Sequence, residues 1–101
     1  MASSRPMKLP SLINGAAMEI YSVARALPGV ERLRLNVSRG FDSDSRYIRI
    51  NAGCGNASVI RVSSHPAPDD NYDLNLLVHN DHERDRAVER ASAWLKENYG
   101  T

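Results

Sequence analysis

The sequence predicts an α+β fold in which two helices cover one face of a four-stranded antiparallel sheet, with the elements in the order α-β-β-β-β-α. Two segments, one near each end of the chain, repeat apolar residues at spacings of three and four, which is the period of a helix surface. Between them, four segments alternate polar and apolar residues, which is typical of strands with one buried face. Four sequential strands favour a meander, and its second face then stays open to solvent or to a partner.

The first helix is expected over Leu9–Leu27. Pro10 suits the first helical turn, where a missing N–H costs nothing, and Pro28 followed by Gly29 is a strong stop signal. This helix carries an apolar stripe that needs a partner surface, made of Leu9, Leu12, Ile13, Ala16, Ala17, Ile20, Ala24 and Leu27.

The four strands follow, separated by turn-forming segments. The residues Gly-Cys-Gly-Asn at 53–56 predict a hairpin turn between the second strand and the third. The segments 38–44 and 65–71 gather Gly, Ser, Asp and Pro, and we expect them to be loops. The strands themselves are expected at Val30–Val37, Arg46–Ala52, Ala57–Ser64 and Tyr72–Val78.

The second helix begins near Asn80. Asn80 as the N-cap, with Glu83 three residues later, forms a pattern like a capping box, and Asp81 is nearly as good an N-cap. We expect the helix to run to about Asn98, with Gly100 just beyond it. Its buried stripe is expected to contain Ala87, Val88, Ala91, Trp94, Leu95 and Tyr99.

The composition fits one modest domain. The chain has 101 residues, of which 42% are hydrophobic and 25% charged, as in ordinary globular proteins. We expect a single domain over residues 9–101 and a disordered tail over residues 1–8. The tail lacks the apolar run of a secretory signal, no segment is apolar enough to span a bilayer, and a single cysteine can form no internal disulfide. A cytoplasmic protein without a membrane partner is therefore expected.

The net charge of +1 hides an uneven distribution along the chain. The first 61 residues contain nine Lys or Arg and four Asp or Glu, whereas the remaining residues contain four and eight. The sequence pI of about 7.9 is below that of a dedicated nucleic-acid-binding protein, and the chain is not an acidic mimic of nucleic acid either.

The outward positions of the expected strands carry the candidate binding residues. Arginine and tyrosine dominate binding hot spots because they combine a large contact area with directional hydrogen bonds. An alternative interpretation is a solvated sheet face on which the arginines pair with Glu31 or Asp73. A shift of one residue in register would scatter the set. The candidates for partner binding are Arg32, Arg34, Tyr47, Arg49, Arg61 and Leu77.

Three histidines, His65, His79 and His82, are the candidates for a metal site. Zinc needs about four ligands that converge at close to 2 Å. His79 and His82 flank a strand-to-helix turn, where a spacing of three fixes no shared direction, and helix capping already explains the polar residues around them. We expect no metal and no cofactor, although the sequence leaves open whether the three histidines converge.

No catalytic set is predicted. Cys54 lies between two glycines without a basic neighbour in sequence that would activate its thiol. The acidic pairs Asp42/Asp44 and Asp69/Asp70 lie in loops, without an oriented partner for acid–base chemistry. Motifs for phosphate loops, dinucleotide binding and nucleophile elbows are absent. We therefore expect that the chain is not an enzyme.

Two resemblances bear on function. The segments Tyr47–Ile50 and Ile60–Pro66 resemble a stretch of small uncharacterised proteins of bacteriophages and prophages, in which a strand ending in Arg-x-Ser-x-His precedes a short loop. This resemblance implies a mobile-element context, in which proteins of this size, including many anti-CRISPR proteins, act by occupying a surface on a host complex. The element order also resembles the double-stranded-RNA-binding domain, which has one strand fewer. The acidic segment Asp81–Asp85 replaces the Lys-rich start of that domain's last helix and argues against binding of duplex RNA.

We therefore expect a small non-catalytic binding protein, similar to an anti-CRISPR inhibitor by size and context, that docks through the open sheet face onto a host protein or nucleoprotein complex. The alternative is a module for single-stranded nucleic acid, in which the arginines meet phosphates and Tyr47 stacks on a base. A third possibility is a homodimer formed through the exposed face or an edge strand.

Overall fold

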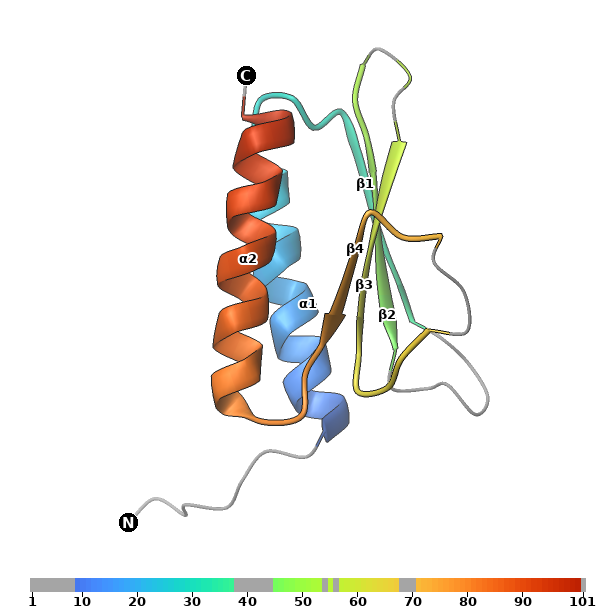
Figure 1. Ribbon diagram of the computed structural model, residues 1–101. Coiled ribbons are helices and arrows are strands. Elements are labelled where there is room, and N and C mark those ends of the chain that lie inside the picture. Colours follow the sequence, from blue (N-terminus) through green and yellow to red (C-terminus); the bar gives the residue numbers. More distant parts are fainter. Residues whose placement is uncertain (1–8, 38–44, 54, 56, 68–70, 101) are drawn as a thin grey trace.

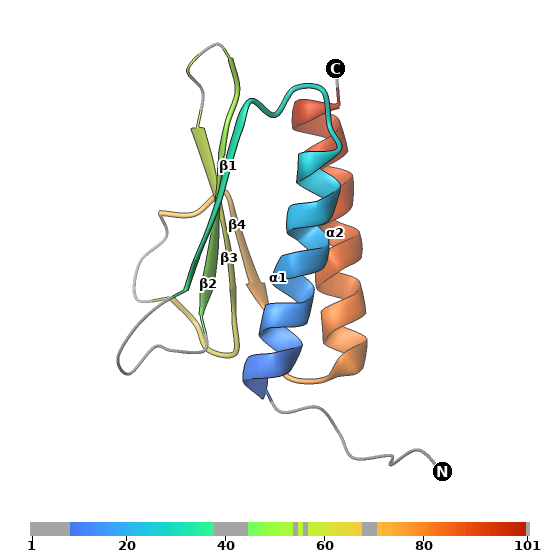
Figure 2. The same ribbon diagram turned by 180° about the vertical axis from the view of Figure 1, so that it is seen from behind.

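The computed structural model describes residues 9–37, 45–53, 55, 57–67 and 71–100. Its elements are α1 (Leu9–Arg25), β1 (Arg32–Val37), β2 (Arg46–Asn51), β3 (Ala57–Ser63), β4 (Leu74–Leu77) and α2 (Asp81–Tyr99). The sheet forms one layer, and both helices lie on a single face of it (Figure 1). The view from behind shows the same two layers, with α1 and α2 side by side (Figure 2). The expected α+β class and order of elements are confirmed.

The sheet is mixed. Its strands lie in the order β1-β2-β3-β4, and the pairs β1–β2 and β2–β3 are antiparallel. β4 runs parallel to β3, with Ile60 beside Leu74 and Val62 beside Leu76. The expectation of a purely antiparallel sheet is therefore wrong for the last pair of strands.

The long connection between β3 and β4, residues 64–73, explains this difference. It is too long for a tight hairpin, so the chain can return along the sheet and enter β4 in the same direction as β3. Its described ends, residues 64–67 and 71–73, lie on the sheet face away from the helices (Figure 1). We call these two described ends the crossover. The crossover covers part of the face that the sequence predicts to be open.

The core lies between the sheet and the two helices. Alternate residues of β2, β3 and β4 face the helices, whose own apolar stripes close the core from the other side. A fully buried Ile or Leu side chain contributes roughly 1.5–3 kcal/mol by leaving water. The buried apolar residues are Leu12, Ile13, Ala16, Ala17, Ile20, Ala24, Ile48, Ile50, Ile60, Val62, Leu74, Leu76, Val78, Ala87, Ala91, Leu95 and Tyr99.

The helix ends follow local signals. α1 ends at Arg25, and a tighter turn follows in which the Leu27 N–H donates to the Ala24 carbonyl at 3.1 Å. At the start of α2, Asn80 is the N-cap, and its Oδ1 accepts from the Glu83 N–H at 2.8 Å. The Glu83 carboxylate in turn accepts the N–H of His79, one residue before the N-cap. The expected capping box is therefore present in a form in which the backbone donor to Glu83 is shifted by one residue, from Asn80 to His79.

Candidate functional site

The strand register places the candidate binding residues on one face of the sheet. Arg34 lies directly opposite Arg49, and Arg32 is two residues from Arg34 and therefore on the same face. Tyr47 lies opposite Arg61 on β3, in the next row of the same face. Leu77 pairs with Ser63, two residues after Arg61. This is the face turned away from the helices, since the buried isoleucines Ile48, Ile50 and Ile60 occupy the alternate positions.

Three arginines form an exposed cluster on this face. Arg32, Arg34 and Arg49, which we call the arginine cluster, are all exposed, and none forms an ion pair with a described residue. Glu31 and Asp73 do not neutralise them in the described part of the chain, and Asp73 instead accepts the N–H of Val59 at 2.8 Å. Like charges that face each other across two strands cost up to about 1 kcal/mol. The cluster is therefore a concentrated positive surface maintained at some cost to stability.

Arg61 differs from the expectation of an exposed side chain. It is only 1% exposed, because the crossover lies over it. Its Nη1 donates to the His65 carbonyl and to Asn75 Oδ1, both at 2.9 Å. Its guanidinium carbon lies 5.9 Å from the centre of the Tyr72 ring, a cation–π distance. Arg61 thus fastens the crossover to the sheet and presents no surface to a partner.

Two tyrosines border the arginine cluster. The rings of Tyr47 and Tyr72 lie 5.8 Å apart, tilted by 32°, and both side chains are half-buried. Tyr72 was not among the predicted site residues, because the sequence placed it at the start of a strand. In the structure it precedes β4 and belongs to the crossover. Tyrosine directly after a Pro-, Asp- and Asn-rich loop was the only signal that could have indicated this role.

Leu77 lies apart from the arginine cluster. It is 39% exposed on β4 and pairs with Ser63, whereas Arg49 pairs with Val59, four residues earlier on β3. The six predicted residues therefore share a face without forming one continuous surface.

A small buried polar cluster lies beneath the crossover. Ser45 Oγ donates to Ser63 Oγ at 2.8 Å, and the His65 N–H donates to the same oxygen at 3.3 Å. Arg61 Nη2 lies 3.5 Å from Ser45 Oγ. Ser45 and Ser63 are fully buried, so their hydroxyls are inaccessible to a substrate. The cluster is a structural hydrogen-bond network that supports Arg61.

The histidines do not converge in a way that indicates a metal centre. His79 Nδ1 lies 2.8 Å from Glu83 Oε1, and its Nε2 lies 2.6 Å from the Ser64 carbonyl. His65 Nδ1 is 3.3 Å from Ser63 Oγ. Within the described ranges, no group of three His, Cys, Asp or Glu side chains is placed to hold a metal ion. Cys54 lies outside the described residues.

The position of His79 predicts a dependence of stability on pH. Both ring nitrogens face acceptors, first the Glu83 carboxylate and then the Ser64 carbonyl, which raises the pKa of His79 above its ordinary value of 6.5. The same contact lowers the pKa of Glu83 below 4.5. The contribution of His79 is therefore full below pH 6.5 and is lost as the pH rises through its raised folded pKa. The contribution of Glu83 is full above pH 4.5 and is lost as the pH falls through its lowered folded pKa.

Glu83→Gln tests this prediction because glutamine keeps an acceptor for the His79 N–H and removes only the charge. We expect the variant to have a lower free energy of unfolding than the wild type at about pH 5.5, and the deficit to shrink as the pH is raised towards about 9, through the raised folded pKa of His79. Urea denaturation of both proteins at the two pH values measures the difference. A deficit of equal size at both values would show that the ion pair contributes nothing.

Comparison with known proteins identifies no relative. No protein-family model, no curated protein and no solved structure matches the chain. In the part of the chain that the structure describes, no helix is long and apolar enough to cross a membrane. The function is therefore argued from the surface itself.

Proposed function

We propose that this chain is a small non-catalytic binding protein that docks through the arginine cluster onto an anionic surface of a host protein or nucleoprotein complex, in the manner of a phage-encoded inhibitor. The observation that carries the proposal is the placement of Arg34 directly opposite Arg49, with Arg32 beside them and no anionic partner among the described residues. Such an arrangement costs stability in the free protein and is relieved when an anion binds.

The chemistry of the cluster suits a flat anionic surface. Guanidinium groups bind carboxylates and phosphates through paired hydrogen bonds, so several of them on one sheet recognise the geometry of a partner as well as its charge. Val59 lies opposite Arg49 and is half-buried, which adds apolar area beside the charges. The strands hold these side chains at fixed spacing, which reduces the entropy cost of binding.

The test compares two double variants that remove the same charge. Arg34→Gln/Arg49→Gln is expected to weaken binding to a host partner about tenfold, and to leave the free energy of unfolding unchanged or raised by up to about 1 kcal/mol. Arg25→Gln/Lys96→Gln removes two charges from exposed positions of the helix layer and should leave binding intact. The measurement is quantitative capture of the partner from a nuclease-treated lysate, followed by titration of the purified partner. The proposal would be refuted if both double variants lost binding equally, or if neither lost binding.

The second candidate function is binding of single-stranded nucleic acid, which the Tyr47–Tyr72 ring pair beside the arginine cluster favours. It predicts that the protein binds a fluorescent oligothymidine of about 16 nucleotides with an affinity that falls steeply with salt. Capture of a partner that is lost after nuclease treatment, together with this salt dependence, would rank this function first.

A further inference from the structure

β4 forms one edge of the sheet. It is the last strand in the order β1-β2-β3-β4, so one side of its backbone has no strand partner among the described residues. Natural proteins protect such edges by keeping the strand short or with proline, charged residues such as lysine, bulges or a covering segment. β4 has four residues, so its length limits the number of added backbone hydrogen bonds. The residues of β4, Leu74-Asn75-Leu76-Leu77, contain none of the protective residue types. An edge of this kind is a template for an added strand.

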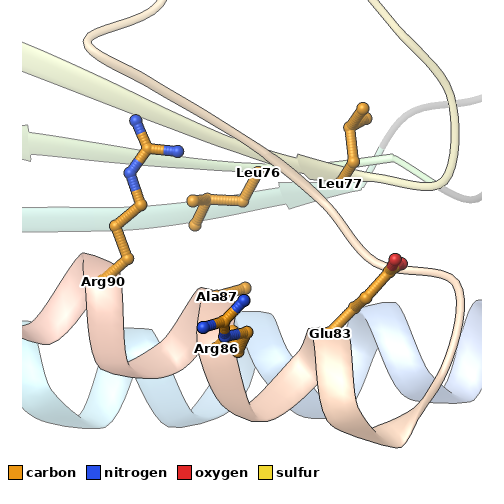
Figure 3. Close-up of a pocket in the computed structure, with 6 residues that line it drawn as sticks. All are labelled: Leu76, Leu77, Glu83, Arg86, Ala87 and Arg90. Atoms are coloured by element: carbon orange, nitrogen blue, oxygen red, sulfur yellow. The ribbon is translucent and has the colours of Figure 1, made fainter.

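A groove runs between this edge and the second helix. It measures about 220 Å³ and is lined by Leu76 and Leu77 from β4 and by Glu83, Arg86, Ala87 and Arg90 from α2 (Figure 3). Leu76 and Ala87 are buried and form its apolar floor, while Leu77 is exposed beside the strand. The groove is therefore apolar along β4 and polar along α2.

The groove has an excess of positive charge. Arg86 and Arg90 are exposed, and neither forms an ion pair with a described residue. Glu83, the only acidic residue that lines the groove, already binds His79. Glu89 lies beside both arginines in the adjoining hollow on α2 but does not line the groove itself. An acidic segment in the groove would therefore meet two guanidinium groups that form no ion pair with a described residue.

The spacing of the two arginines matches that of an extended peptide. Arg86 and Arg90 are one helical turn apart, which is a rise of about 6 Å. Side chains two residues apart on a strand point to the same face and lie about 6.7 Å from each other. Figure 1 shows α2 running roughly along the direction of the strands, so the two spacings lie along a common axis.

We infer that the β4 edge binds an acidic, extended segment of a partner protein as a fifth strand. Its backbone would pair with β4, and two acidic side chains in an acidic-x-acidic pattern would face Arg86 and Arg90. The groove lies at the β4 edge beside α2 and shares no residue with the arginine cluster, so the inference stands whether or not the proposed function does.

Two labelled peptides of identical composition test the inference. Thr-Val-Glu-Val-Glu-Val-Thr places both acidic residues on one face of a strand, whereas Thr-Val-Glu-Glu-Val-Val-Thr places them on opposite faces. We expect the first to bind about tenfold more tightly in a fluorescence anisotropy titration. We also expect the backbone amide signals of Leu74–Leu77 to shift in NMR spectra when it binds.

Matched variants assign the binding to the groove. Arg86→Gln/Arg90→Gln should abolish the preference for the first peptide, whereas Arg32→Gln/Arg34→Gln, which removes the same charge from the other face, should keep it. Equal affinities for the two peptides, no binding at about 1 mM peptide, or a preference that survives Arg86→Gln/Arg90→Gln would overturn the inference. Sedimentation that shows a dimer lost in Arg86→Gln/Arg90→Gln would also overturn it, since a second copy of the chain would then occupy the edge.

Discussion

Arg61→Ala is expected to lower the free energy of unfolding by about 3 kcal/mol, a large fraction of the total for a domain of this size. The side chain is buried, and alanine would leave a cavity beneath the crossover. It would also leave the His65 carbonyl and Asn75 Oδ1 without the donor that each has at 2.9 Å. Equilibrium denaturation in urea measures the loss.

Arg61→Met separates the packing role of this residue from its charge. Methionine retains much of the length of arginine and should still pack on Tyr72, whose ring centre lies 5.9 Å from Arg61 Cζ. It also removes Arg61 Nε, which is buried and has no hydrogen-bond partner in the described structure. Removing this buried charge, whose Nε has no partner among the described residues, recovers part of the desolvation cost, so we expect a loss of about half that of alanine. Losses below about 1 kcal/mol in both variants would show that the crossover does not depend on Arg61.

Arg61 also shapes the border of the arginine cluster on the side of the crossover. Arg61 holds the crossover over part of the sheet face, and Tyr72 of the crossover packs against Tyr47 beside the cluster. A loss of partner binding in Arg61→Met would therefore reflect a change in this border, because the buried guanidinium cannot touch a partner. Arg61 is a positioning residue for the proposed surface.

The sequence was sufficient to predict the elements but not the direction of the last strand. Alternation of polar and apolar residues is the same in parallel and antiparallel strands, so the pattern of Leu74, Leu76 and Val78 indicates a buried face and no orientation. The direction depends on the path of the chain from β3 to β4, and alternation within a strand carries no information about that path. The burial of Arg61 could not be predicted for the same reason.

The candidate surface was predictable to the extent that it depends on local alternation. The period of two places Arg32, Arg34 and Arg49 on one face of the sheet, and the register brings Arg34 opposite Arg49. The role of Tyr72 and the groove beside β4 depend on contacts between segments far apart in the sequence. Arg86 and Arg90 look like solvated helix residues until the neighbouring edge of the sheet is known.

Gly29→Ala is expected to destabilise the fold by about 2 kcal/mol, although the sequence suggests only a helix stop at this position. The Gly29 N–H donates to the Tyr99 carbonyl at 2.8 Å, which joins the α1–β1 connection to the end of α2. A Cβ at Gly29 would lie 2.6 Å from that carbonyl oxygen and 2.9 Å from the Tyr99 Cα. Both atoms are backbone, so the end of α2 would have to move. Thermal and urea denaturation measure the effect.

Gly15→Ala is the matched control for this change and should have the opposite sign. Gly15 lies inside α1. Apart from its chain neighbours and the nearby backbone of its own helix, no described atom lies within 4 Å of the position that its Cβ would occupy. Alanine there should stabilise the helix by about 0.5–1 kcal/mol, because it reduces the backbone freedom of the unfolded chain. The movement forced at Gly29 would also reach β3, since the Tyr99 hydroxyl lies 2.6 Å from Ser58 Oγ. If both alanines stabilise the protein, the close approach at Gly29 does not constrain the fold.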